Sequence, residues 1–561
     1  MSKFTIYQVF PRYFGNYNTA NKHNGSIDEN GCGKFNSFTN KALNEIKSLG
    51  ISHIWYTGVI EHATQTDYSA YGITKDHPAI VKGKAGSSYA IKDYYDVDPD
   101  LAESVPDRMK EFENLVKRTH QAGMKVIIDF VPNHVARQYR SDAKPEGVKD
   151  LGETDHQGWA FSPLNNFYYL PNQPFTPRFD LQGYVEFPAK ATGNDRFTAS
   201  PDKNDWYETV KLNYGVNYVE GMQKQFDPIP DTWIKMRDIL LFWGSKNIDG
   251  FRCDMAEMIP VEFWGWVIPQ VKMKYPGIIF IAEVYQPGQY RNYLSNGKFD
   301  YLYDKVGMYD LLRNVVSRNF PARDITNAWQ QLGNIQENML NFLENHDEQR
   351  IASGFFAGDG MYAIPAMIVS ATLTNAPVMI YSGQELGEQG MDSEGFSGLD
   401  GRSTIFDYWG TPSVQAWANN GKFDGKLLTE EQKQLRAFYR KLLNITLSEK
   451  AITNGLMYDL EYANFDNPKF NSHEQYAYLR KFNDELLLVL VNFDDKHLDT
   501  EIRIPHEAFL YLNIKEGEKY SATDLLSENT FAEPIELSEG KVFRTNMKPW
   551  SGLVLKLKIE N

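Results

Sequence analysis

The chain has 561 residues, 58 basic and 73 acidic side chains, a formal net charge of −15, and two cysteines. This length provides for roughly two to four domains of ordinary size, and the excess of negative charge excludes nucleic acid and anionic membranes as main partners. Cys32 and Cys253 are too few for a disulfide framework or a cysteine zinc site, and the sequence contains no apolar run of about 18 residues that could span a membrane.

The N-terminal residues MSKFTIYQVFPRYFG contain no hydrophobic signal core and enter a strand-like segment almost at once. We therefore expect a cytoplasmic protein, or a periplasmic or secreted one if a signal peptide has been trimmed. Eight short apolar runs, rich in β-branched and aromatic residues, have the length of buried parallel strands. In chain order they are Ile6–Phe10, His53–Val59, Lys125–Val131, Gly250–Asp254, Ile278–Val284, Phe299–Tyr303, Met339–Leu343 and Pro377–Tyr381.

Helical patterns separate these runs. Pro106 opens one of them, and Gly123 closes it before the next strand. Another places Trp233, Ile239 and Trp243 on one face. Eight strands that alternate with helices predict an α/β fold, a closed (β/α)8 TIM barrel. A doubly wound sheet is the alternative.

Two segments interrupt this alternation. Residues 135–225 are rich in Pro, Asn, Tyr and Asp with little periodicity, which predicts a loop excursion or small lobe after the third strand. Beyond about residue 449 the pattern changes to short strands, beginning with Tyr476–Phe482 and Leu486–Phe493. We expect a barrel formed by 1–134 and 226–448, the inserted lobe 135–225, and a C-terminal antiparallel β-sandwich over 449–561.

Several of the predicted barrel strands end in charged residues. These ends read DFVPNH (129–134), GFRCD (250–254), AEV (282–284) and ENHD (344–347). Functional residues of a parallel barrel lie at the C-terminal ends of its strands. The carboxylates at these ends are therefore expected to converge on one mouth. The alternative is a structural ion-pair cluster around Arg252.

Converging carboxylates of this kind suit the cleavage of an acetal bond between sugars. A retaining mechanism needs a carboxylate nucleophile and a carboxylic acid only about 5–5.5 Å apart, and a third carboxylate can raise the pKa of the acid. Arg252 lies two residues before Asp254, on the same strand face, where it can keep that carboxylate ionised. His134 and His346 can donate hydrogen bonds to sugar hydroxyls, although a histidine taken singly is more often a satisfied core residue than a ligand.

At these residues the chain resembles the α-amylase family, glycoside hydrolase family 13, along nearly its whole length. The four strand ends look like the four signature segments of that family, in the right order. GISHIWYTGV (50–59) and GQELG (383–387) resemble its second- and eighth-strand motifs. VKLN (210–213) is similar to the fifth signature in the form found in the neopullulanase and maltogenic-amylase branch.

The resemblance implies Asp254 as nucleophile, Glu283 as general acid/base and Asp347 as transition-state stabiliser. It also implies that Arg252, His134 and His346 contact the sugar at the cleavage point. Tyr89 matches the aromatic platform beneath that sugar, with a loop-packing tyrosine as the alternative. Asp129 is expected to support the network from below, and Arg402 to reach the sugar beyond the cleavage point. For the other rings among the 11 Trp, 33 Tyr and 34 Phe, we expect core packing.

Two features depart from the family pattern. Glu257 and Met258 stand where most α-amylases carry Lys-His, which puts the usual acceptor-side contacts and part of the calcium site in doubt. Asn133 matches the calcium-binding asparagine of the family, and a hydrogen bond within the loop is the alternative. No cofactor is needed for the chemistry, and a structural calcium ion is an open expectation.

Together these observations predict a retaining α-glycosidase that cleaves α-1,4-glucosidic bonds in starch, maltooligosaccharides or related α-glucans. A 4-α-glucanotransferase or an exo-acting α-glucosidase would use the same triad, and a binding protein on an inactive amylase scaffold is the alternative from another class. The first barrel strand begins near residue 5, so we expect no dimerisation domain of the kind found in the neopullulanase branch. We therefore expect a monomer.

Overall fold

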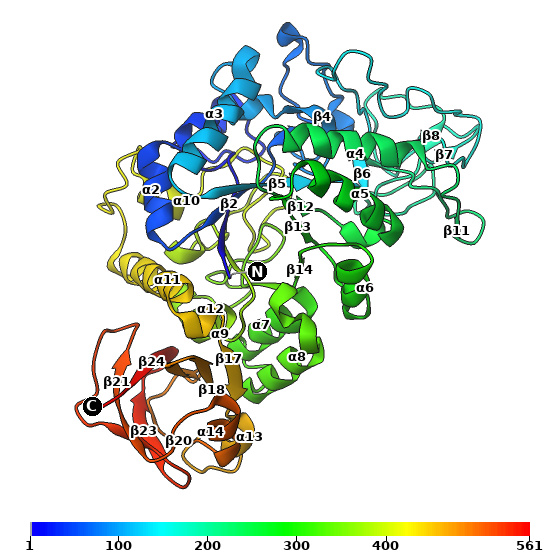
Figure 1. The fold of residues 1–561 in the computed structure, drawn as a ribbon. Coiled ribbons are helices and arrows are strands. Elements are labelled where there is room, and N and C mark those ends of the chain that lie inside the picture. Colours follow the sequence, from blue (N-terminus) through cyan, green and yellow to red (C-terminus); the bar gives the residue numbers. More distant parts are fainter. Residues whose placement is uncertain (1–2, 561) are drawn as a thin grey trace.

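Eight parallel strands close into a barrel in the computed structural model, which describes residues 3–560 (Figure 1). The strand order around the barrel is β1-β16-β15-β14-β13-β12-β5-β2. Their bounds are β1 Thr5–Val9, β2 His53–Tyr56, β5 Lys125–Phe130, β12 Gly250–Cys253, β13 Ile279–Ala282, β14 Tyr301–Tyr303, β15 Met339–Phe342 and β16 Val378–Tyr381. The predicted TIM barrel is confirmed, and the doubly wound sheet is excluded because β1 pairs with both β2 and β16.

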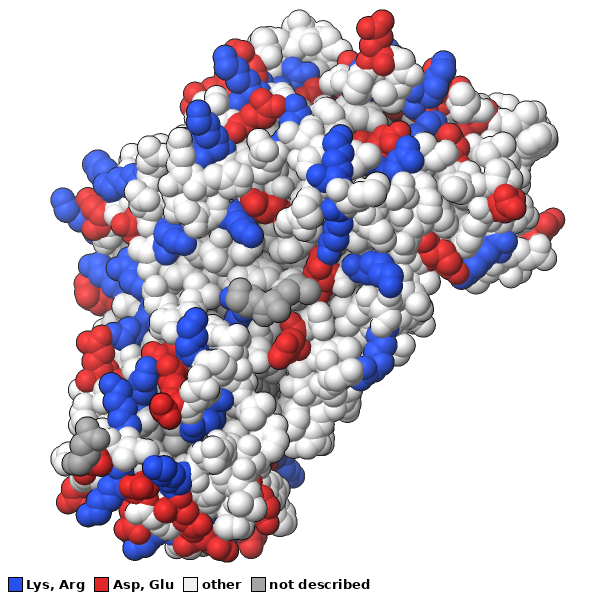
Figure 2. Space-filling model, in the orientation of Figure 1, with Lys and Arg blue, Asp and Glu red and all other residues white. Residues whose placement is uncertain are grey.

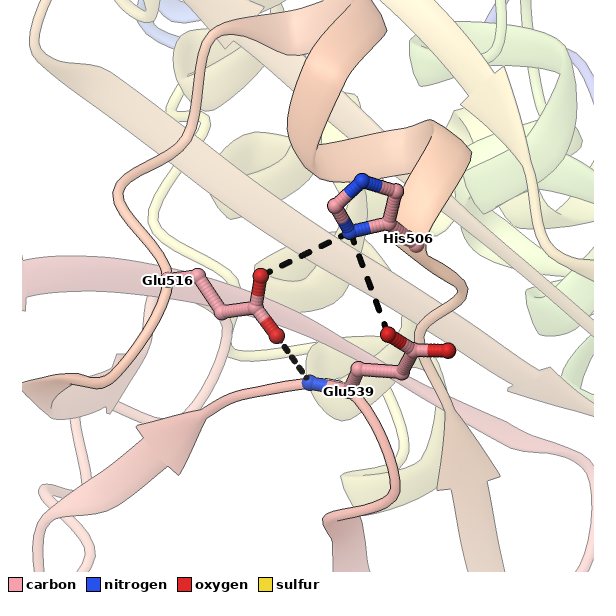
Figure 3. A group of neighbouring side chains, drawn as sticks. All are labelled: His506, Glu516 and Glu539. Atoms are coloured by element: carbon pink, nitrogen blue, oxygen red, sulfur yellow. Dashed lines mark hydrogen bonds and ion pairs between the residues drawn. The ribbon is translucent and has the colours of Figure 1, made fainter.

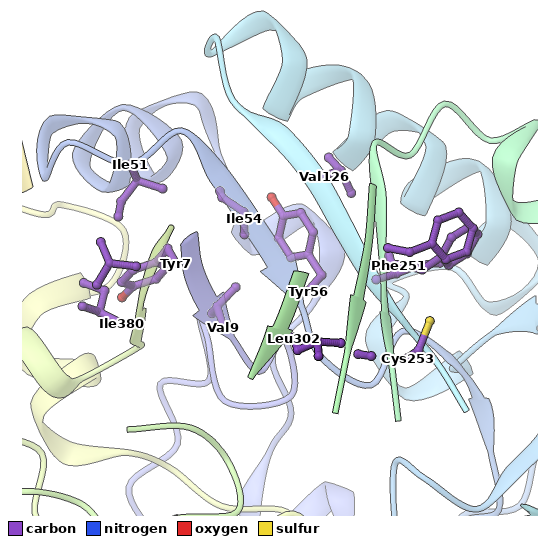
Figure 4. Close-up of a cluster of buried hydrophobic side chains, with 14 of the residues drawn as sticks. Tyr7, Val9, Ile51, Ile54, Tyr56, Val126, Phe251, Cys253, Leu302 and Ile380 are labelled. Atoms are coloured by element: carbon purple, nitrogen blue, oxygen red, sulfur yellow. The ribbon is translucent and has the colours of Figure 1, made fainter. Parts of the chain in front are cut away.

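Alternation of side chains along the strands divides the buried residues into two layers. Outward-facing residues pack between the strands and the surrounding helices, as Tyr7, Phe251 and Cys253 do in Figure 4. Arg252 lies between Phe251 and Cys253 in sequence and therefore points into the barrel. The interior is thus apolar along most of the barrel and charged near the C-terminal ends of the strands.

The helices that cover the barrel follow the predicted apolar patterns. α3 (Arg108–Gln121) begins two residues later than expected, because Pro106 lies in the preceding 3-10 turn η5 (Val105–Asp107). α4 (Asp231–Gly244) buries the predicted face with Trp233, Ile239 and Trp243. The other barrel helices are α2 (Asn40–Ser48), α5 (Val261–Lys274), α6 (Tyr290–Ser295), α7 (Asp310–Val316), α8 (Ile325–Leu332), α9 (Ile364–Thr372), α10 (Pro412–Ala418) and α11 (Glu430–Ser448).

Residues 135–225 form long irregular loops beside the barrel, joined by short two-stranded ladders (Figure 1). The ladder nearest the barrel pairs β6 (His134–Ala136) with β9 (Thr209–Lys211). The remaining ladders pair β7 (Tyr169–Leu170) with β8 (Ala189–Lys190), and β10 (Val216–Asn217) with β11 (Gln223–Lys224). Since β6 continues directly from the end of β5, these loops lie next to the C-terminal ends of the barrel strands. A further hairpin, β3 (Ile60–His62) with β4 (Ile91–Val97), follows β2.

An antiparallel sheet follows the barrel in the C-terminal part of the chain, with strand order β17-β18-β19-β24-β21-β22. Its strands are β17 Leu456–Asp459, β18 Gln475–Phe482, β19 Glu485–Asn492, β24 Ser551–Ile559, β21 Glu518–Asp524 and β22 Ile535–Leu537. One face, with Tyr478 and Val489, packs on the barrel around α9, while the other builds a second core with β20 (Leu498–Arg503), β23 (Val542–Met547) and α14 (His506–Leu512).

The surface carries charges of both signs. On the face drawn in Figure 2, lysines and arginines are interspersed with aspartates and glutamates rather than gathered into one patch. Within residues 3–560, the longest helices are too short or too polar to cross a bilayer. The face drawn in Figure 2 therefore shows no concentration of charge of one sign.

Asp304 is a buried carboxylate that makes stability depend on pH. It follows β14 and caps the π-helical turn η8 (Lys305–Tyr309), accepting a 2.9 Å hydrogen bond from the Met308 N–H. Burial raises its pKa to about 6, against about 3.9 for an unfolded aspartate. The folded protein therefore holds a proton between these values that the unfolded chain has released, so this contribution to stability is lost as the pH rises through about 6.

Asp304→Asn keeps the cap acceptor but cannot ionise. We expect the melting temperature of the variant, relative to wild type, to rise by several degrees between pH 4 and pH 8, measured by calorimetry across that range. If the difference in melting temperature between variant and wild type stayed the same across this pH range, the assignment would be contradicted.

Candidate active site

A cavity of about 370 Å³ opens at the C-terminal ends of the barrel strands. Five of the predicted site residues line it, namely Tyr89, His134, Asp254, Glu283 and Asp347. His134 begins β6, and the other four come from the loops that follow β3, β12, β13 and β15. The closed barrel therefore brings together side chains that are as much as 258 residues apart in sequence (Tyr89 to Asp347).

The Arg252 guanidinium lies beneath this cavity and contacts carboxylates from four strand ends. Its Nη1 donates to Asp254 Oδ1 at 2.7 Å and to Asp129 Oδ1 at 3.4 Å. Its Nη2 lies 3.0 Å from Glu283 Oε2 and 4.0 Å from Asp347 Oδ2. Only 1% of Arg252 is exposed. A buried guanidinium is stable only when paired in this way, so Arg252 and the four acids depend on one another.

The charges in this cluster do not balance if every acid is ionised. Burial raises the pKa of Asp129 to about 6 and raises the pKa of Asp254, while Arg252 opposes both shifts. Burial also raises the pKa of Asp347. The four carboxylates share one buried cation, so each opposes the ionisation of the others. A site of this kind can supply both an ionised carboxylate and a carboxylic acid.

The peptide after Asp254 connects the two catalytic candidates. Met255 has a left-handed backbone with φ of 43°, which is rare for a side chain of this size. This conformation turns the Met255 N–H toward Glu283, and it donates to Oε2 at 2.7 Å. The strained residue therefore holds Glu283 at a fixed position relative to Asp254.

Tyr89 and His346 form a stacked pair at one wall of the site, with ring centroids 5.1 Å apart and an interplanar angle of 17°. The Gln8 amide contacts His346 Nδ1 at 2.8 Å, and burial lowers the pKa of His346 well below its usual value. The imidazole is therefore neutral, with its proton on Nε2, 3.1 Å from Asp347 Oδ2. The Tyr89 hydroxyl donates to Asp129 at 3.3 Å.

The other predicted residues take more indirect positions. His134 lines the cavity next to Trp206, and burial lowers its pKa to about 3, so it too is neutral. Asp129 lies under the cavity, where it accepts hydrogen bonds from Trp55 Nε1 at 3.0 Å and from the Gly58 N–H at 3.2 Å. Arg402 does not line the cavity. Its Nε donates to the Asp347 carbonyl at 2.6 Å and so supports the loop behind that carboxylate.

Several residues that line the cavity were not found from the sequence. They are Lys82, Ser87, Trp206, Glu208, Thr209, Met255, Tyr285, Ile405 and Phe406. Most belong to irregular loops, in which no periodicity marks an inward-facing position. Met255 and Tyr285 are exceptions, because they stand one residue after Asp254 and two residues after Glu283 at strand ends, and that spacing could have identified them.

Asn133 does not fit a calcium ion. Its Oδ1, the atom that would coordinate the cation, accepts a hydrogen bond from Lys211 Nζ, and its Nδ2 donates to the Gly193 carbonyl at 2.8 Å. Lys211 is buried and lies 2.7 Å from Asp195 Oδ1. An ammonium group that already takes these oxygens leaves no room for a second cation beside it.

Two other groups among residues 3–560 have the composition of metal sites, and neither lines the cavity. His506, Glu516 and Glu539 lie on the surface of the C-terminal part (Figure 3), with the Glu539 N–H bonded to Glu516 at 2.8 Å. The second group is Glu61, Asp93 and Asp96, all buried. Burial raises the pKa of Glu61 well above its usual value and that of Asp93 to about 6, and Asp96 is paired with Arg108 at 2.5 Å.

Comparisons with known proteins agree with this geometry. The family profile described as "Alpha amylase, catalytic domain" matches residues 8–445. Alpha-amylase 3 of Dictyoglomus thermophilum is 24% identical over 543 residues, covering 92% of this chain and 90% of that protein. A cyclomaltodextrinase of Thermoanaerobacter pseudethanolicus is 22% identical and covers 92% of this chain and 72% of that one. The structure of an α-amylase from Geobacillus thermoleovorans with acarbose superposes with a TM-score of 0.63 at 16% identity, covering 100% and 99% of the two chains.

The Lys211 contacts predict how the protein responds to removal of metal ions. Treatment with EDTA is expected to leave the melting temperature unchanged, because an ammonium rather than a metal ion bridges Asn133 and Asp195. Lys211→Met is expected to lower the melting temperature, since it leaves these two groups without their partner, at a cost of about 1–3 kcal/mol. A fall in melting temperature with EDTA that calcium reverses would overturn this assignment.

Proposed function

The chain belongs to the α-amylase family of glycoside hydrolases, and from that premise we propose that it is a retaining hydrolase of α-1,4-glucosidic bonds. The substrates would be starch, maltooligosaccharides or related α-glucans. The observation that carries the proposal is the pairing of Asp254 and Glu283 with one guanidinium, at 2.7 and 3.0 Å. Two acids held by neighbouring nitrogens suit the close spacing of about 5–5.5 Å used in retention better than the wider spacing used in inversion.

In the proposed first step, an Asp254 oxygen attacks the anomeric carbon and forms a glycosyl ester. Glu283 gives its proton to the departing oxygen, which takes the electron pair of the glycosidic bond. In the second step, Glu283, now a carboxylate, removes a proton from water as the water oxygen attacks the anomeric carbon and releases Asp254. Asp347 and neutral His346 would hold sugar hydroxyls, and Asp347 would stabilise the positive charge that develops on the ring.

The walls of the cavity support a neutral sugar as the ligand. Tyr89, Trp206 and Phe406 present aromatic surface, while His134 and Thr209 supply uncharged hydrogen-bonding groups beside the carboxylates. The apolar faces of a sugar ring suit such surfaces, and its hydroxyls suit the polar groups. Residues 206–209 come from the segment 135–225, so these loops would take part in setting the length of glucan that fits.

A 4-α-glucanotransferase or an exo-acting α-glucosidase would use the same three acids. The position of Glu257 bears on this choice. Its carboxylate accepts hydrogen bonds from backbone N–H groups and does not line the cavity. It therefore offers no obvious hold for an acceptor sugar, which favours water as the acceptor. Transfer and exo-cleavage become outcomes of the product test below.

Removal of either catalytic acid tests the assigned roles. Asp254→Asn and Glu283→Gln are expected to lower the release of reducing sugar from maltoheptaose by at least about 10³-fold, with melting temperatures close to that of wild type. Glu262→Gln, at an exposed position on α5, serves as the matched control and should keep full activity. Substantial turnover by a folded Asp254→Asn or Glu283→Gln variant would refute the assignment.

The anomeric form and size of the products test the rest of the proposal. Wild type acting on maltoheptaose should first release α-anomers, observed by proton NMR, and chromatography should show shorter maltooligosaccharides. Initial β-anomers would rule out retention. Chains longer than the substrate would indicate transfer, and glucose as the main first product would indicate exo-cleavage.

A further inference from the structure

The two carboxylate oxygens of Glu283 have different partners. Oε2 accepts from the Met255 N–H at 2.7 Å and lies 3.0 Å from Arg252 Nη2. Oε1 is bonded to the Tyr285 hydroxyl. Because both neighbours of Oε2 are N–H donors, neither can accept a proton from it. When Glu283 is protonated, the proton therefore resides on Oε1, next to Tyr285.

Tyr285 is placed to act on that oxygen. It follows Glu283 by two residues after β13, and its side chain lines the same cavity as Glu283 and Asp254. Burial raises the pKa of Tyr285 far above its usual value, and the neighbouring Glu283 raises it further, so its hydroxyl keeps its proton. A phenolic hydroxyl can either accept a hydrogen bond from the carboxylic acid or donate one to the carboxylate.

Glu257 fixes the backbone that carries Tyr285. Its Oε2 accepts hydrogen bonds from the N–H groups of Tyr285 and Gln286, each at 3.1 Å. The Tyr293 hydroxyl also holds the turn that contains Glu257, since its single O–H lies 2.9 Å from the Ile259 carbonyl and 3.1 Å from the Glu257 carbonyl. The loop after the nucleophile is thus bonded to the loop after the acid/base.

We propose that Tyr285 is a positioning residue for Glu283, and that Glu257 acts through it by holding its backbone. The proposal rests on the function proposed above. In the free enzyme, the Tyr285 hydroxyl holds Oε1 at the edge of the cavity. During cleavage the O–H bond at Oε1 breaks, the proton passes to the departing sugar oxygen, and Tyr285 donates a hydrogen bond to the carboxylate that remains. Tyr285 therefore stabilises the carboxylate form of Glu283, which is produced when Glu283 gives its proton to the sugar.

A comparison of two substrates tests this role. Maltotetraose needs a proton on its leaving group, whereas 2,4-dinitrophenyl α-maltoside releases an acidic phenol that departs without one. Tyr285→Phe should lower kcat/KM for maltotetraose by about 10- to 100-fold, the effect of losing a hydrogen bond to a charged group. It should change kcat/KM for the aryl substrate by less than about threefold, because general-acid catalysis contributes little there.

Variants at Glu257 test the second half of the proposal. Glu257→Ala removes the acceptor for the Tyr285 and Gln286 N–H groups and should show the same selective loss with maltotetraose. Glu257→Gln retains an oxygen acceptor at that position and should recover most of the activity. Glu262→Ala, which removes an exposed glutamate paired with Lys224, is the matched control and should behave as wild type.

The possible outcomes separate this inference from the proposed function. Equal losses with both substrates would show that Tyr285 only shapes the cavity, and the absence of any loss would show that Glu283 does not need it. Either result overturns the inference while wild-type hydrolysis still supports the function. A wild type that cleaves neither substrate would instead overturn the proposed function itself.

Discussion

The interaction on which the site depends is the pairing of one buried guanidinium with acids from four different strands. Arg252 points into the barrel because of the alternation along β12, and its register partner on β5 is Asp129. Strand pairing therefore sets the positions of Arg252 and Asp129, and the other three acids follow the ends of their own strands. A shift of one residue in the register of β12 would turn Arg252 outward into the apolar layer and leave the acids of the other three strands without their cation.

The pairing of the four acids with Arg252 fixes their positions and also affects which of them are ionised. Four acids around a single buried cation oppose one another's ionisation, which favours a site that holds both a carboxylate and a carboxylic acid. Neutral His134 and His346 add hydrogen-bonding capacity without adding charge. The backbone also contributes, since Met255 adopts a strained conformation to bond Glu283. The positions of the acids and their protonation therefore both depend on the same cluster around Arg252.

The barrel and its carboxylates could be predicted because they follow regular patterns. Buried parallel strands leave uninterrupted apolar runs, and a charge that ends such a run stands out, as Asp254 and Glu283 do. Trp206 and Phe406 could not be found, because irregular loops have no period that distinguishes inward from outward positions. The partner of Asn133 was equally hidden, since Lys211 follows it by 78 residues and only the fold brings them together. Family motifs locate chemistry at strand ends but do not describe the loops.

Helix α9 has a consequence for how the protein can be divided. Residues 365–372 of this helix are all buried, between the barrel on one side and strands β19 and β24 on the other. A barrel cut off after α11 would expose the side of this apolar helix that faces β19 and β24, and it would be prone to self-association. The C-terminal sheet is thus not an appended module that evolution or an engineer could exchange freely. It covers the apolar surface of α9, and any replacement would have to supply an apolar face that packs on this helix.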